Sequence, residues 1–201
     1  MTTRASRWLA SVACALALPA GSSAWAQAVH PADRWEYALE AGYTAKVRDN
    51  SPFDYRIAPF HLAFRSPAFA DLWTSAEGAR LTVRHRISLV AEAIAQGPET
   101  HYVAIQGAPV FELWAPDRRT AGFFEIGGGF GFLDSRGVPG GQGQDFAFNW
   151  YTQGGLRRQL TQDMAITGAL YFTHHSNLGM TDPNPGIDVL GLNVGLVFAF
   201  R

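Results

Sequence analysis

Cysteine is almost absent from this 201-residue chain, which contains one, Cys14. That residue falls within residues 1–26, which have the pattern of a secretory signal peptide. Residues 27–201, the expected mature chain, therefore contain no cysteine. This absence excludes a disulfide framework, a thiolate metal site and a cysteine nucleophile from the mature protein.

The expected signal peptide has the three parts that export requires. Arg4 and Arg7 supply a positive start, residues 8–20 supply an apolar core, and residues 24–26 supply a small-x-small cleavage site. The sequence thus predicts export of a single domain, residues 27–201.

Charge is also scarce. Charged residues make up 16% of the chain, against about 25% in typical soluble domains. Without Arg4 and Arg7, 14 basic residues face 17 acidic ones, so the mature chain carries a small negative net charge. Nothing in this balance favours a nucleic-acid partner.

Long hydrophobic runs are missing after the signal. The longest stretch without Asp, Glu, Lys or Arg is residues 164–181, and it contains threonine, histidine, serine and asparagine. Such a stretch cannot be a membrane-spanning helix. The other structure that satisfies a backbone in lipid is a closed β-barrel, built from strands of about ten residues that alternate apolar and polar side chains.

Alternation is clearest at the C-terminal end of the chain. One face of this segment carries large apolar residues: Leu190, Leu192, Val194, Leu196, Phe198 and Phe200. The other face carries mainly small residues, and a helical period would scatter the two sets. The segment resembles the terminal strand of outer-membrane barrels, except that Arg201 follows the last aromatic residue.

Similar patterns predict eight strands: 35–46, 55–65, 80–96, 102–114, 121–133, 145–160, 163–175 and 187–200. The expected fold is all-β, an eight-stranded antiparallel transmembrane β-barrel of the bacterial outer membrane. A barrel of this size is filled by side chains and is too narrow for a porin.

Side-chain parity also predicts what lies inside and at the rims. Five polar residues should form an interior hydrogen-bond and ion-pair network: Glu125, Asn149, Gln153, Arg157 and Asn193. Three tryptophans are expected in the interfacial belts: Trp73, Trp114 and Trp150. The glycine-rich residues 137–143 are expected to form one mobile loop.

The segment between the last two strands, residues 174–188, carries the most chemistry. With both termini periplasmic, it lies at the outer surface. Parity places His174, Ser176 and Asp188 on the lipid-facing side, where unpaired polar groups are costly. Pairing of the two antiparallel strands should bring them together, and a carboxylate, an imidazole and a hydroxyl are the components of an activated serine nucleophile.

His175 has the opposite parity and is expected to face the barrel interior. Adjacent histidines on one strand cannot easily bind one metal ion, so no metal site is predicted. Asn184, Pro185 and Gly186 have the composition of a turn.

The run His174-x-Ser176-Asn177-x-Gly179, followed by Gly186-Ile187-Asp188, resembles the active-site segment of the outer-membrane lipid A 3-O-deacylases (PagL type). The stretch at residues 124–129 is also similar to a segment of that family. The resemblance covers roughly residues 121–200.

This resemblance implies hydrolysis of the 3-O-linked acyl ester of lipid A, the lipid anchor of lipopolysaccharide, with outer-membrane lipids as surroundings and no cofactor. By position, His174 would be the base, Ser176 the nucleophile and Asp188 the acid, in place of the family's glutamate. Asn177 and Gly179 would form the oxyanion hole.

Two other interpretations remain open at the level of the sequence. A non-catalytic outer-membrane barrel with a structural or adhesive role would explain the signal and the strands, but not the lipid-facing serine, histidine and acid. A soluble periplasmic lipocalin-like barrel would place the large apolar side chains inside, around a ligand. A homodimer is neither required nor excluded.

Overall fold

The computed structural model describes residues 29–200, so the expected signal peptide, residues 1–26, lies outside the described residues. One short 3-10 helix, η1 (Pro31–Asp33), precedes the strands. The strands are β1 (Glu36–Lys46), β2 (Arg56–Arg65), β3 (Ala70–Thr74), β4 (Arg80–Gln96), β5 (His101–Trp114), β6 (Thr120–Leu133), β7 (Phe146–Gln159), β8 (Met164–Ser176) and β9 (Ile187–Ala199). No helix among residues 29–200 is long and apolar enough to span a membrane.

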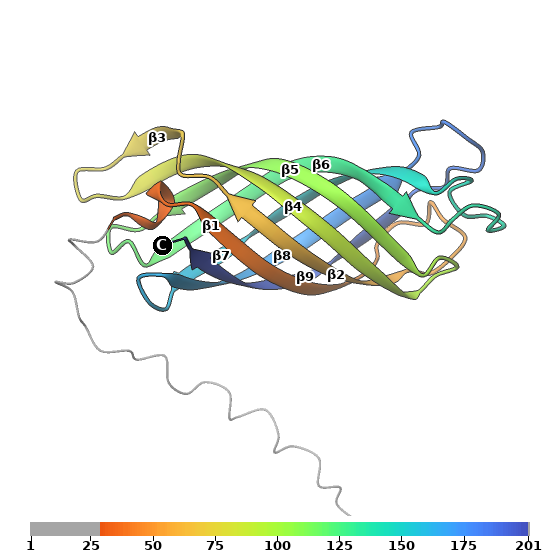
Figure 1. Ribbon diagram of the computed structural model, residues 1–201, viewed down its shortest axis with the longest axis horizontal. Coiled ribbons are helices and arrows are strands. Elements are labelled where there is room, and N and C mark those ends of the chain that lie inside the picture. The colour runs from red at the N-terminus through yellow and green to blue at the C-terminus, as the bar shows by residue number, and fades with distance from the viewer. Residues whose placement is uncertain (1–28, 201) are drawn as a thin grey trace, which may run out of the picture.

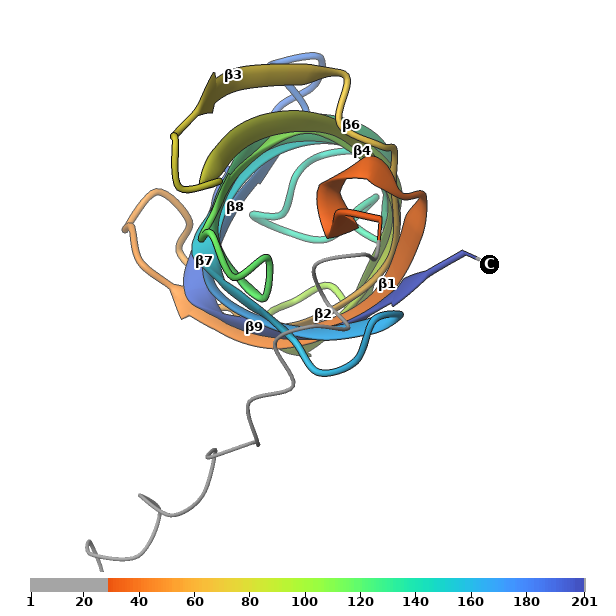
Figure 2. The ribbon, with the colours of Figure 1, turned by 90° about the vertical axis from the view of Figure 1, so that its left-hand side faces the viewer.

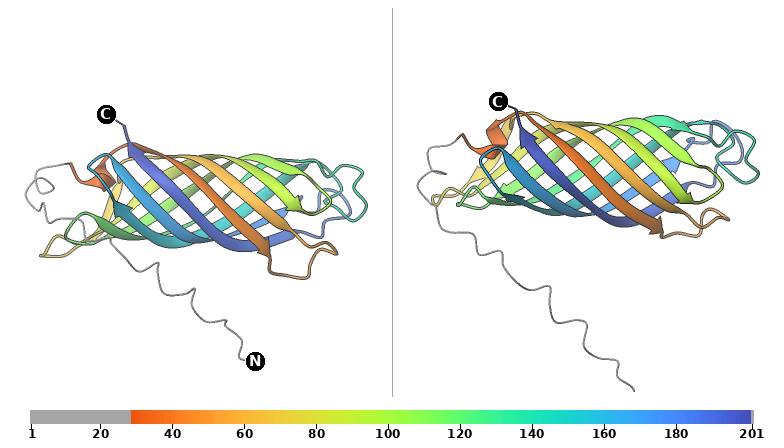
Figure 3. Two further views of the ribbon diagram at one scale, coloured as in Figure 1. Left: turned by 90° about the horizontal axis from the view of Figure 1, so that it is seen from below. Right: turned by 60° about the horizontal axis from the view of Figure 1, so that its bottom comes forward.

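Eight of these strands close into an antiparallel barrel. Each strand pairs with its sequence neighbour from β4 to β9, β1 pairs with both β2 and β9, and β2 pairs with β4. Figure 2 looks into the resulting ring, and Figure 3 shows the tilted strands from two further sides. The expected eight-stranded fold is confirmed, and no predicted strand end is displaced by more than one residue.

β3 was not predicted from the sequence. Its five residues pair with the beginning of β4, outside the ring of the barrel (Figure 2). Four of the five are exposed on both faces of the strand, so the segment has no buried side and no period-two pattern. β4 is 17 residues long, and its beginning extends far enough past the barrel to accept this extra strand.

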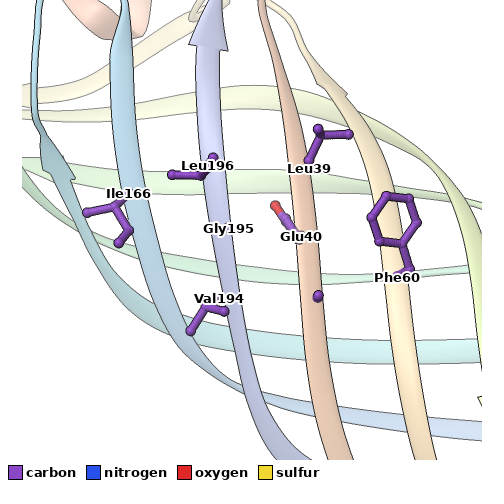
Figure 4. Close-up of a pocket in the computed structure, with 8 residues that line it drawn as sticks. Leu39, Glu40, Phe60, Ile166, Val194, Gly195 and Leu196 are labelled. Carbon is purple, nitrogen blue, oxygen red and sulfur yellow. The ribbon is translucent and has the colours of Figure 1, made fainter.

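The outer surface of the barrel is apolar. Leu39, Phe60, Ile166, Val194 and Leu196 surround a shallow outer depression, seen in Figure 4. Their neighbours in sequence, such as Glu40, are buried on the inner side. Large side chains therefore face lipid and polar ones face the interior, which excludes the lipocalin-like alternative.

The interior contains a network of buried ion pairs. Arg86 contacts Glu40 at 2.9 Å and Glu125 at 3.2 Å, and Arg65 contacts Glu40 at 3.0 Å. A second group lies nearer the chain termini and is formed by Glu36, Arg84, Glu112 and Arg157. The Asn193 amide joins this network by donating to Glu40 at 3.1 Å and to Gln153 at 3.2 Å. Asn149 also faces the interior, as its parity predicted, and accepts from the Tyr102 hydroxyl.

Glu36 connects two arginines and provides a test of this network. Its carboxylate lies 2.7 Å from Arg84 and 2.5 Å from Arg157. Glu36→Gln should lower the free energy of unfolding by about 3–5 kcal/mol, because it leaves buried guanidinium charge uncompensated. Urea titration of the detergent-solubilised protein measures this change. Glu77→Gln, at an exposed position, is the control, and equal unfolding midpoints for the two variants would contradict the prediction.

Trp114 corrects one prediction. It is fully buried inside the barrel and is not part of an interfacial belt. Its indole N–H donates to Glu112 at 3.0 Å, and the Arg157 guanidinium lies 4.9 Å from the ring centre. The reason is parity: the neighbouring Leu113 faces outward, so Trp114 must face inward. Trp73 lies on β3, outside the barrel.

Both termini of the described chain lie at one end of the barrel, and the β8–β9 connection lies at the other (Figure 1). If the termini are periplasmic, trypsin added to intact cells should cut after Arg48 or Arg136, whose side chains are mostly exposed at the far end. Arg118 and Arg119, in the turn before β6, should be cut only after the outer membrane is permeabilised. Mass spectrometry of the fragments decides, and the reverse pattern would invert the orientation.

Candidate active site

The candidate site is built where β8 ends and β9 begins. Ser176 is the last residue of β8, and Asp188 is the second residue of β9. The connection between them turns back at the barrel end opposite the termini (Figure 1). Antiparallel pairing sets His174 directly opposite Asp188 in the strand register.

His174 and Asp188 are joined by a short polar contact. His174 Nδ1 lies 2.7 Å from Asp188 Oδ1. The Asp188 side chain is 1% exposed, whereas that of His174 is 24% exposed. The carboxylate is thus shielded from water on all sides while the imidazole remains accessible. Because Nδ1 faces the acid, Nε2 is the ring nitrogen left for another partner.

Ser176 lies two residues beyond His174 on the same face of β8. Both residues line a depression of about 310 Å³ together with Phe148, Trp150 and Leu178. Within residues 29–200, no hydrogen bond joins the Ser176 hydroxyl to His174. Catalytic hydrogen bonds often tighten only when a substrate is bound, so this geometry is compatible with a nucleophile and its base.

Two aromatic residues of this depression were not predicted as site residues. Phe148 and Trp150, on β7, are the cross-strand partners of Ser176 and His174. The rings of Trp150 and His174 are 6.2 Å apart between centroids. Trp150 was expected in the interfacial belt. Its register opposite His174 is the signal that places it in the site.

His175 faces the barrel interior, as its parity predicted. It is fully buried, and its Nε2 lies 3.1 Å from Glu92 Oε2. His174 and His175 therefore lie on opposite sides of the β8 strand. Among residues 29–200, no group of three or more histidine, cysteine or acidic residues could hold a metal ion.

The two predicted oxyanion donors already have partners. The backbone N–H of Asn177 donates to Asn184 Oδ1 at 2.9 Å, and that of Gly179 donates to Asn177 Oδ1 at 2.8 Å. The turn after β8 thus satisfies its own backbone with asparagine side chains. Use of either N–H by a substrate requires that the amide oxygen move aside.

Residues 137–143 lie in the connection between β6 and β7, as expected, and pack against neighbouring segments. Gln142 is fully buried, its N–H donates to Ser135 Oγ at 2.7 Å, and its carbonyl accepts from Asn177 Nδ2 at 2.6 Å. A Cβ on Gly141 would lie 2.6 Å from Ser135 Oγ. The glycine is needed for this close packing, which fixes the position of Asn177 beside Ser176.

Glu99 links this loop to the first hairpin. Its carboxylate accepts from Ser135 Oγ at 2.7 Å and from the Tyr55 hydroxyl at 2.9 Å. Burial raises the pKa of Tyr55, and the Glu99 charge raises it further, so the phenol keeps its proton and remains a donor. The segments around Ser176 are therefore held by contacts from three other connections.

Asp188 also has two partners that its local sequence does not indicate. Asn50 Nδ2 donates to Asp188 Oδ2 at 2.7 Å, and Arg48 Nη1 lies 3.6 Å from the same oxygen. Both residues lie in the connection between β1 and β2, far from Asp188 in sequence. Closure of the barrel brings them there, because the first and last strands of the barrel are neighbours.

Comparisons with known proteins agree with this architecture. Residues 58–197 match the family model described as "Lipid A 3-O-deacylase (PagL)". The solved structure titled "Crystal structure of the outer membrane enzyme PagL" is similar with a TM-score of 0.53 and 18% sequence identity. The match covers 80% of this chain and 97% of that one. No curated protein matches the chain.

Proposed function

Because the chain belongs to the lipid A 3-O-deacylase (PagL) family, we propose that it hydrolyses the 3-O-linked acyl ester of lipid A with His174, Ser176 and Asp188 as a catalytic triad on the outer face of the barrel. Family membership identifies the chain as an ester hydrolase of the bacterial outer membrane. The observation that carries the proposed triad is the 2.7 Å contact between His174 and the buried Asp188, beside Ser176.

The proposed reaction is acyl transfer in two steps. His174 Nε2 takes the proton of Ser176 as Oγ attacks the ester carbonyl, and the same proton then passes to the departing sugar hydroxyl. Water attacks the resulting acyl-serine and gives a proton to His174, which returns it to Ser176 Oγ as the 3-hydroxy fatty acid is released. Asp188 holds the imidazole tautomer and stabilises the imidazolium in both steps.

The developing oxyanion needs donors near Ser176. Asn177 and Gly179 are the proposed ones, and each would exchange a neutral amide acceptor for the charged oxygen. Such an exchange is favourable because hydrogen bonds to an ionised acceptor are roughly twice as strong as neutral ones. Asn184, the present partner of the Asn177 N–H, would swing away as the substrate binds.

The proposed position of the site suits a substrate that is itself a membrane lipid. Phe148 and Trp150 flank His174 and Ser176 on the outer surface and provide apolar contact for an acyl chain. Lipid A can then reach the serine laterally, with its ester at the level of the outer rim and its chains along the barrel.

Mass spectrometry of lipid A tests the proposed reaction directly. Lipid A from cells that express the protein should lose one 3-hydroxyacyl chain relative to cells that lack it, and the purified protein should release the same chain in detergent micelles. The Ser176→Ala protein is the matched control. Unchanged lipid A in both settings would contradict the function.

A further inference from the structure

The carboxylate of Asp188 is held from both sides. His174 occupies Oδ1, and Asn50 Nδ2 donates to Oδ2 at 2.7 Å. We propose that Asn50 is a positioning residue that fixes the plane of the Asp188 carboxylate so that Oδ1 stays directed at His174. This inference rests on the proposed catalytic role of Asp188.

The pairing of β1 with β9 closes the barrel and positions Asn50 for this contact. Lys46, at the end of β1, pairs with Val189 on β9. One residue further, the Val47 N–H donates to the Asp188 carbonyl at 3.0 Å. The connection that carries Asn50 is thus fastened to the backbone of Asp188 itself, which brings the Asn50 amide over the acid.

A second donor is needed because the aspartate side chain does not fix its own orientation. The terminal torsion of aspartate is broad and roughly two-fold, so a single hydrogen bond leaves the carboxylate plane free to turn. A bond to each oxygen removes that freedom. Asn50 is neutral, so it orients the carboxylate without cancelling the negative charge that an imidazolium needs.

The remaining contacts of Asn50 favour this role over a local loop role. A structural asparagine in a turn commonly accepts a backbone N–H with Oδ1. Asn50 Oδ1 is buried and has no hydrogen-bond partner within residues 29–200. The Asn50 side chain donates its hydrogen bond, from Nδ2, to Asp188.

Gly186 holds Asn50 and His174 in one compact group. A Cβ at this position would lie 3.0 Å from Asn50 Nδ2 and 3.0 Å from His174 Cε1. Its φ of +73° also favours glycine. The bare backbone of residue 186 therefore lies against both side chains that contact Asp188.

Arg48 is the alternative partner of the same oxygen, but its contact is weaker. It lies 3.6 Å from Asp188 Oδ2, and its side chain is 70% exposed. Because the Arg48 side chain is largely in solvent, this longer contact is screened by water and salt. Asn50, with the shorter bond, is the residue that sets the orientation.

A double-mutant cycle on purified protein in micelles of lipid A and detergent tests the proposal. Asn50→Leu keeps the approximate side-chain volume and removes the donor. It should lower kcat by roughly 10- to 100-fold, the range for losing a hydrogen bond to a charged group, with KM little changed. Asn50→Gln, which keeps an amide donor, should retain more activity. Asp49→Ala, at a fully exposed neighbour, should leave kcat within about twofold.

The decisive measurement is the same substitution in the Asp188→Asn background. If Asn50 acts through Asp188, Asn50→Leu should cause little further loss there, so the two effects are not additive. The positioning role alone would be overturned if Asn50→Leu left kcat unchanged, or if it lowered kcat equally with and without Asp188→Asn. A near-normal kcat for Asp188→Asn would overturn the triad, and the role of Asn50 with it.

Discussion

Replacing Ser176 with alanine should abolish release of the 3-hydroxyacyl chain, and His174→Ala should do the same. Each loss should be at least about 1,000-fold in kcat, because nucleophile and base act as one unit in such sites. Both side chains lie in the outer depression and neither belongs to the interior ion-pair network. The barrel should therefore fold normally in both variants, which urea titration checks.

His175 provides the matched control for His174. It is the next residue in sequence but lies inside the barrel against Glu92. His175→Gln should keep near-normal kcat in the folded protein, although it should lower stability because the Glu92 carboxylate loses a buried partner. If His175 were essential for turnover and His174 dispensable, the assignment of the two faces of β8 would be wrong.

Asp188→Asn should lower kcat by orders of magnitude while preserving the fold. The amide has the shape of the carboxylate but lacks the charge that stabilises the imidazolium, and its NH2 group can face His174 Nδ1 and favour the wrong tautomer. The substitution also places a second amide beside the Asn50 side chain, in place of the carboxylate that accepts its hydrogen bond. Turnover of lipid A in micelles measures the effect.

Asp188→Glu tests how closely the surroundings fit the shorter acid. The buried Asp188 carboxylate lies between His174 and Asn50, each 2.7 Å away. An added methylene must displace at least one of them, so we expect activity between those of Asp188→Asn and the wild type. Near-normal turnover for Asp188→Asn would remove the acid from the mechanism, whatever glutamate does.

The sequence predicted the barrel well because period-two alternation is a direct consequence of strand geometry. The same rule placed His174 and Asp188 outside and His175 and Glu125 inside. It failed for β3, which has no buried face, and it was not applied to Trp114, whose parity with Leu113 already required an inward position.

Other parts of the site depend on contacts that local sequence cannot specify. Asn50 meets Asp188 only through the pairing of β1 with β9, and nothing near Asn50 in sequence indicates an acid. The N–H groups of Asn177 and Gly179 are occupied because asparagine side chains of the same turn accept their hydrogen bonds. The sequence does not specify these side-chain conformations. Residues 137–143 likewise depend on a distant partner, because Ser135, in the same connection, bonds to both Gln142 and Glu99, and Glu99 lies between β4 and β5.

The arginine and glutamate side chains that cross the barrel interior also determine what cannot travel along it. A hydrated ion needs a continuous column of water, and here guanidinium and carboxylate groups occupy the cross-section at two successive levels. An eight-stranded barrel has little space beyond its own side chains. The protein can therefore lie in the outer membrane without making that membrane permeable to ions. A planar bilayer that contains the protein should show no ionic current.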